Sequence, residues 1–280
     1  MNIVAGGDSF IYGSELKDQD KCYSNTGISE LTFTALLAKE YNLSYVCAAF
    51  PGNSNGAIAR LVMNACETLD KSDTIVFVMW TFPGRFEFRF NYFTGRRTTP
   101  WHSVNAWDVA EGVSELEQHF HNQDTEVSKI FERNAVIMNR TGISAFAKEF
   151  YKHVGDNEIY ELYTTLKEVV LLQNYLISNN IPYLFTTADA PFRTCITPRH
   201  MAEEVSLKSL YDQIVWDNWF EFPEGTAPGD TLSPRGFYQW AIENKYPVGT
   251  THPLEEAHEG AAELLKDKFN ELVKKSIQQN

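Results

Sequence analysis

Cysteine, basic charge and long apolar runs are all scarce in this sequence. The 4 cysteines among 280 residues lack the paired spacing of a metal site, so we expect reduced thiols in a cytosolic setting. No charged leader and no apolar run of membrane-spanning length is present, and we therefore expect a cytoplasmic protein without a signal peptide or membrane span. Acidic residues outnumber basic ones by 37 to 24, and the net charge of −13 argues against nucleic acids or anionic membranes as partners.

Repeats, low-complexity segments and linker-like stretches are also lacking. Hydrophobic residues make up 43% of the chain, which is enough for a sizeable core. We therefore interpret residues 1–280 as a single α/β domain. His102, His119 and His121 have no carboxylate or thiol companion at ligand spacing, so we expect no metal and no other cofactor.

Short apolar runs alternate along the chain with segments of helical spacing. The runs typical of buried strands cover residues 3–7, 43–49, 73–80 and 181–186. Strands that alternate with helices favour a parallel sheet covered on both faces, and we predict four or five strands in the order 2-1-3-4-5. The fifth strand is expected to be short and to lie near Trp216, Trp219 and Phe220.

Two stretches are too long to be plain connections between these elements. Residues 82–155, after the third strand, begin with an aromatic part and continue with helical spacing, so we predict an inserted cap. Residues 189–250 form a second, irregular insertion. We expect the aromatic part of the cap, residues 82–107, to select the substrate.

The first apolar run ends abruptly at the motif Gly-Gly-Asp-Ser. A serine that follows a buried strand places its hydroxyl at the carboxyl edge of the sheet, where open α/β sheets bind their ligands. Ser9 is therefore the candidate nucleophile, and the backbone N–H groups of the turn are candidates for stabilising an oxyanion. Taken alone, the motif is equally compatible with an ordinary turn, because glycine, aspartate and serine are common turn residues.

Two further loops complete a pattern with the first. Pro-Gly-Asn-Ser-Asn at residues 51–55 follows the second strand, and His252-Pro253 opens the final helix. With these three loops the chain resembles the SGNH, or GDSL-like, hydrolases over nearly its whole length. The resemblance implies a flavodoxin-like, three-layer α/β/α sandwich, which is the SGNH hydrolase fold. It also implies hydrolysis of esters, such as acetyl groups on sugars or lipid esters.

The resemblance assigns roles to individual positions. Ser9 matches the family nucleophile and His252 the general base, while the N–H groups of Ser9 and Gly52 match two oxyanion donors. Asn53 is expected at the same site, where it would contact the substrate or hydrogen-bond the surrounding loops, and an Asx turn is the alternative. Asp8, next to the nucleophile, is expected to support the loop rather than to take part in the chemistry.

The sequence departs from the family at two positions. Where the family's third loop supplies an asparagine to the oxyanion hole, this chain has Thr81 as the nearest substitute, and Arg85 is a second candidate through its charge. Arg85 is equally well explained as a structural ion-pair partner, for example of Glu87. Three residues before the histidine, where the family has an aspartate, this chain has Gly249.

The sequence therefore leaves the orientation of His252 open. A Ser-His dyad, a backbone carbonyl, or a carboxylate such as that of Asp230 or Glu255 would each serve. His258, about two turns into the final helix, is expected at the surface.

The leading hypothesis is a serine esterase or deacetylase that acts on a small-molecule or carbohydrate ester. Ser9 would attack the acyl carbonyl and His252 would carry the proton. Gly52, with Thr81 or Arg85, would stabilise the oxyanion. An acyltransferase would use the same site if water were excluded. A catalytically decayed binding or structural protein is the alternative that the two departures favour.

Installing the missing aspartate is a test that follows from the sequence. If Gly249 does not need a backbone conformation closed to aspartate, Gly249→Asp is expected to raise the rate of ester hydrolysis by orienting His252. The rate would be measured beside that of His252→Ala, and a fully active His252→Ala variant would show that another group is the base.

Overall fold

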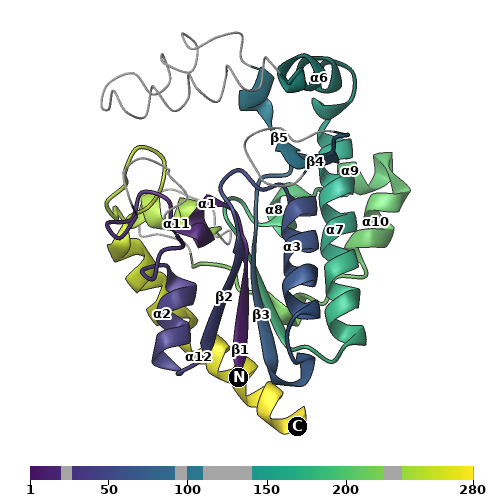
Figure 1. Cartoon of the computed structure of the whole chain (residues 1–280). Coiled ribbons are helices and arrows are strands. Elements are labelled where there is room, and N and C mark those ends of the chain that lie inside the picture. Colours follow the sequence, from purple (N-terminus) through teal and green to yellow (C-terminus); the bar gives the residue numbers. More distant parts are fainter. Residues whose placement is uncertain (20–26, 92–99, 110–140, 224–234, 280) are drawn as a thin grey trace.

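The sheet at the centre of the molecule is parallel and has four strands (Figure 1). The computed structural model describes residues 1–19, 27–91, 100–109, 141–223 and 235–279. The sheet strands are β1 (Asn2–Gly7), β2 (Ser44–Ala49), β3 (Thr74–Trp80) and β6 (Tyr183–Thr187). They lie in the order β2-β1-β3-β6, which confirms the predicted parallel sheet and the relative order of its first four strands.

The fifth strand predicted near residues 216–220 is wrong for the described part of the chain. This segment forms a short 3-10 helix, η4 (Trp216–Asn218), and then a single parallel bridge between Phe185 and Trp219. The Trp219 ring packs edge-on against Phe185 with the ring centroids 5.5 Å apart. This segment is therefore attached to the edge of the sheet by ring packing and by a single backbone hydrogen bond of 2.7 Å, from the Phe220 N–H to the Phe185 carbonyl, without a continued ladder.

Two layers of helices cover the sheet and make a three-layer α/β/α sandwich (Figure 1). One layer contains α2 (Phe33–Glu40) and α12 (Glu255–Gln279), and the other contains α3 (Asn55–Glu67), α7 (Glu158–Ser178) and α10 (Val205–Tyr211). Side chains of β1 alternate between the two layers, as the pleat of a strand requires. Ile3 and Ala5 belong to the core on the α2 and α12 side, whereas Val4 belongs to the core on the other side.

The described part of the inserted cap lies beyond the carboxyl edge of the sheet (Figure 1). It consists of the antiparallel pair β4 (Phe86–Arg89) and β5 (Trp101–Val104), the 3-10 helix η2 (Ala106–Val109), α6 (Ile143–Phe150) and the π-helix η3 (Tyr151–Gly155). The helical spacing predicted for the second part of the cap falls largely on residues 110–140, which lie outside the described residues.

Short helices complete the chain. These are α1 (Ser9–Tyr12), η1 (Lys71–Asp73), α8 (Phe192–Cys195), α9 (Pro198–Glu203) and α11 (Phe237–Glu243). Across the described residues, none of the helices combines the length and the hydropathy that a membrane crossing would need.

Gly6 of β1 allows helix α3 to approach the sheet closely. A Cβ atom at position 6 would lie 2.3 Å from Cγ2 of Val62, which is fully buried in α3. Contacts this short force buried neighbours to move, and overpacking of this kind typically costs about 1–3 kcal/mol. Close packing between β1 and α3 therefore depends on the absence of a side chain at this position.

We predict that Gly6→Ala lowers the free energy of unfolding by about 1–3 kcal/mol, measured by urea denaturation. Gly56→Ala is the matched control, because a Cβ atom there would have its nearest neighbour at 3.7 Å, an ordinary van der Waals contact. Since Gly56 is helical, its replacement is expected to leave stability unchanged or to raise it by up to about 1 kcal/mol. Equal stability of the two variants would contradict this account of the packing.

Candidate active site

Ser9 stands at the carboxyl edge of the sheet, directly after β1. The strand ends at Gly7, and Asp8 caps the short helix α1 by accepting a hydrogen bond of 3.1 Å from the backbone N–H of Phe10. Ser9 is the first residue of that helix and is 8% exposed. The structure therefore places the predicted nucleophile where the sequence located it.

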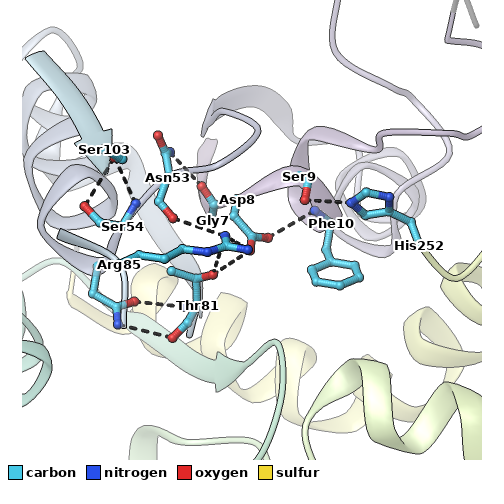
Figure 2. Close-up of polar contacts among 11 residues, drawn as sticks. Gly7, Asp8, Ser9, Phe10, Asn53, Ser54, Thr81, Arg85, Ser103 and His252 are labelled. Carbon is cyan, nitrogen blue, oxygen red and sulfur yellow. Dashed lines mark hydrogen bonds and ion pairs between the residues drawn. The ribbon is translucent and has the colours of Figure 1, made fainter. Parts of the chain in front are cut away.

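His252 lies against Ser9 although 243 positions separate them in the sequence (Figure 2). Nε2 of His252 and Oγ of Ser9 are 2.7 Å apart, and the histidine is 9% exposed. The Phe10 ring packs edge-on against the imidazole, with the ring centroids 5.0 Å apart. The two side chains that the motifs singled out are thus in direct hydrogen-bond contact.

Glu15 contacts the other nitrogen of the imidazole. Its Oε1 atom lies 3.0 Å from Nδ1 of His252 and accepts a hydrogen bond of 3.1 Å from the hydroxyl of Thr251. Nδ1 also lies 2.8 Å from the hydroxyl oxygen of Thr251. An ionised carboxylate only accepts hydrogen bonds, and the Thr251 hydroxyl donates to Glu15, so we assign the ring proton to Nδ1, where Glu15 and Thr251 both offer acceptor oxygens. In the neutral ring, Nε2 is then the acceptor for the Ser9 hydroxyl, which is the arrangement that a general base requires.

Glu15 is held in its charged form. Burial acts to raise the pKa of Glu15, but the hydrogen bond and charge of His252, together with the hydrogen bonds from Thr251, outweigh burial and lower the pKa below its ordinary value. The backbone of Glu15 has φ of 71°, in the left-handed region that residues other than glycine seldom adopt.

The carboxylate beside His252 differs from both candidates that the sequence suggested. Glu255 accepts a hydrogen bond of 2.6 Å from the backbone N–H of Lys17, and Asp230 lies outside the described residues. No motif marks Glu15, whose one sequence signal is its nearness to Ser9 along the chain. The pairing depends on how the loop after α1 folds back, which local patterns do not report.

Arg85 forms its ion pair with Asp8, and the pairing suggested with Glu87 is wrong. Its Nη1 atom donates to Oδ2 of Asp8 at 3.0 Å, while Glu87 binds Arg60 through two hydrogen bonds of 2.6 and 2.9 Å. Thr81 also donates to Oδ2 of Asp8, at 2.6 Å, and accepts from Arg85 Nη1 at 2.9 Å (Figure 2). These contacts hold the completely buried carboxylate that precedes the nucleophile.

The second loop is tied to the same edge of the sheet. Asn53 donates from Nδ2 to the carbonyl of Gly7 at 2.9 Å, and Asn55 accepts from the Thr81 N–H at 2.9 Å. Gly52 has φ of 77°, a conformation that explains why glycine stands there. The loop-binding role expected for Asn53 is therefore seen, and its amide is engaged with β1.

Histidines of the cap do not form a metal site in the described part of the chain. His102 is buried, with its Nε2 atom 4.0 Å from Oδ2 of Asp108, while His119 and His121 lie outside the described residues. The described residues contain no group of three or more histidine, cysteine, aspartate or glutamate side chains arranged to hold a metal ion.

Comparisons with known proteins assign no function. No family model matches the sequence, and no curated protein matches it significantly. The psychrotrophic esterase EstA from Pseudoalteromonas sp., in a structure inhibited by monoethylphosphonate, is 12% identical with a TM-score of 0.42, covering 99% of this chain and 98% of that one. Phospholipase A1 from Streptomyces albidoflavus NA297 is 13% identical with a TM-score of 0.39, covering 95% of this chain and 98% of that one.

The surface position expected for His258 is wrong. The residue is 1% exposed, and its Nδ1 atom accepts a hydrogen bond of 3.2 Å from the backbone N–H of Phe33. Burial lowers the pKa of His258 to about 3, and the charge of His252 acts in the same direction. His258 is therefore a neutral core residue that joins α12 to the start of α2.

Neutral burial of His258 makes folding stability depend on pH. The unfolded chain binds a proton at this residue below its ordinary pKa of 6.5, whereas the folded chain does so only near pH 3. Stability from this group is thus complete above pH 6.5 and falls between pH 6.5 and about 3, by up to about 1.4 kcal/mol per pH unit. We predict that His258→Asn, which keeps an acceptor for Phe33, shows a shallower pH dependence of urea stability, whereas the exposed control His153→Asn does not.

Proposed function

We propose that this protein is a serine hydrolase that cleaves an ester of a small molecule or carbohydrate. The observation that carries the proposal is the 2.7 Å contact between Oγ of Ser9 and Nε2 of His252, with the opposite nitrogen against Glu15. A serine hydroxyl is a weak nucleophile unless a base accepts its proton, and the proposed base is His252, whose Nε2 atom faces the hydroxyl. The resemblance of the three loops to the SGNH hydrolases supports the same assignment.

The reaction would proceed in two stages. Oγ of Ser9 attacks the acyl carbonyl carbon while Nε2 of His252 takes the hydroxyl proton, giving a tetrahedral intermediate with a negative oxygen. The backbone N–H groups of Ser9 and Gly52 are the proposed donors to this oxygen. His252 then gives the proton to the leaving alcohol, and a water molecule, activated by the same base, releases the acyl group from Ser9.

Thr81 and Arg85 are proposed to support the turn beside Ser9 rather than to bind the oxyanion. Their described hydrogen bonds hold Asp8, and neither residue offers a side-chain amide of the kind that the family's third loop supplies. We propose that they fix the turn that presents the Ser9 N–H. The Arg85 guanidinium also stacks over the Phe82 ring at 4.7 Å, at the start of the aromatic segment proposed to select the substrate.

We predict that Ser9→Ala abolishes hydrolysis of a short acyl ester such as p-nitrophenyl acetate, with kcat/KM lowered by at least about a thousandfold. His252→Ala should be similarly impaired. Labelling by a fluorophosphonate probe, read by mass spectrometry, should place the adduct on Ser9 in the wild type and be lost in both variants.

Matched controls separate this effect from general damage to the protein. Ser209→Ala and His153→Ala replace exposed residues of the same types and should retain full activity. The Ser9→Ala variant should keep a thermal midpoint near that of the wild type. Undiminished turnover by Ser9→Ala would contradict the assignment of Ser9 as the nucleophile. A folded wild type that neither hydrolyses esters nor reacts with the probe would favour a decayed site instead.

A further inference from the structure

We propose that the carboxylate that orients His252 comes from the segment after the nucleophile, namely from Glu15, and that Glu15 and Gly249 are one coupled pair. Glu15 is thus the positioning residue of the site, and Gly249 is the residue that makes room for it. This inference rests on the proposed function, because it concerns the base of the same reaction.

The space beside Gly249 is occupied by Glu15. A Cβ atom built at position 249 would lie 2.1 Å from Oε2 of Glu15, so a side chain there would push the carboxylate away from its present position. The backbone of Gly249 lies outside the left-handed region that favours glycine, and conformation therefore does not demand glycine at this position. The position of the Glu15 carboxylate requires glycine there, because a side chain at position 249 and the side chain of Glu15 would occupy the same volume.

This geometry overturns the expectation that Gly249→Asp alone raises the rate. The new aspartate would meet an existing carboxylate at the position it needs, and two carboxylates forced together repel one another. The single substitution is therefore expected to lower activity or stability.

The conformation of the loop after α1 places Glu15 beside Gly249 and His252. Both Gly13 and Ser14 donate backbone hydrogen bonds to the carbonyl of Ser9, at 3.0 and 2.9 Å, which ties the loop to the nucleophile itself. Gly13 and Glu15 then both have positive φ values, 83° and 71°, and turn the chain toward residues 249–252. A strained conformation at a glutamate persists only where surrounding contacts enforce it, and such strain clusters at functional sites.

Contacts from residues 249–252 hold the Glu15 carboxylate in place. The Thr251 backbone N–H donates to Oε2 of Glu15 at 3.3 Å, and the Thr251 hydroxyl donates to Oε1 at 3.1 Å. The backbone N–H of Gly249 donates a hydrogen bond of 2.8 Å to the carbonyl of His252, and this bond closes the turn that contains Thr251. Glu255, a second acidic residue near this turn, accepts a hydrogen bond from the backbone N–H of Lys17 instead.

The first experiment measures kcat and KM for a short acyl ester in Glu15→Gln and Glu15→Ala. Because Glu15 acts through His252 rather than on the substrate, kcat is expected to fall by roughly a hundredfold to ten-thousandfold while KM changes little. Glu255→Ala is the matched control, since it removes a hydrogen bond between the same two loops without touching His252. This control should keep the wild-type kcat.

The second experiment exchanges the carboxylate between the two positions. Gly249→Asp is combined with Glu15→Ala, so that the aspartate enters the volume that Glu15 vacates. We expect the double variant to recover at least tenfold in kcat over Glu15→Ala, although Gly249→Asp alone is impaired. A loop-stabilising role for Glu15 would not produce such a reversal of sign.

A third readout needs no substrate and keeps this inference separate from the proposed function. The low-field proton NMR signal of the His252 Nδ1–H, which depends on the carboxylate partner, should be present in the folded wild type and lost in Glu15→Gln. Wild-type kcat in both Glu15 variants, or an unchanged signal in Glu15→Gln, would overturn the role of Glu15. Turnover that survives Ser9→Ala would instead remove the proposed function while leaving the NMR result to stand for Glu15.

Discussion

The chain of hydrogen bonds from Ser9 through His252 to Glu15 is the interaction on which the rest of this molecule depends. It joins the turn after the first strand to the turn before the last helix, across 243 positions of sequence. The parallel sheet, with helices packed back onto it, brings those two turns to one edge. Side chains of β1 alternate between the two cores, and Gly6 allows α3 to pack closely against the strand. This packing holds the end of β1 in place and so determines the geometry of the site.

A second requirement is a carboxylate buried beside the nucleophile. Asp8 has no exposed surface, and an isolated charge in such a place would be costly. Hydrogen bonds from the Phe10 N–H, the Thr81 hydroxyl and Arg85 meet that cost. Thr81 and Arg85, which stand where the family's oxyanion asparagine was expected, thus stabilise the turn through Asp8. The proposed oxyanion site therefore consists of backbone N–H groups.

Local patterns in the sequence were sufficient for the four strands of the sheet, because buried parallel strands are apolar on both faces. Ser9 was marked by the motif at the end of the first strand, whereas His252 was singled out by the resemblance of three loops to a known family. The partners of Glu15, Arg85 and His258 were not predictable in this way, because each pairing joins side chains that are far apart in the sequence. His258 illustrates the limit, since a polar residue in an amphipathic helix is ordinarily at the surface, and here the Phe33 N–H gives it a buried partner.

The wide separation of the proposed nucleophile and its base along the sequence also causes a delay during synthesis of the chain. Ser9 and Glu15 leave the ribosome before their histidine, which follows 243 positions after Ser9. At ordinary rates of synthesis of about 5–20 residues per second, the interval is roughly 12 to 50 s. Throughout that time the nascent chain carries a serine without its base, so the proposed chemistry stays switched off until the last helix has begun to emerge.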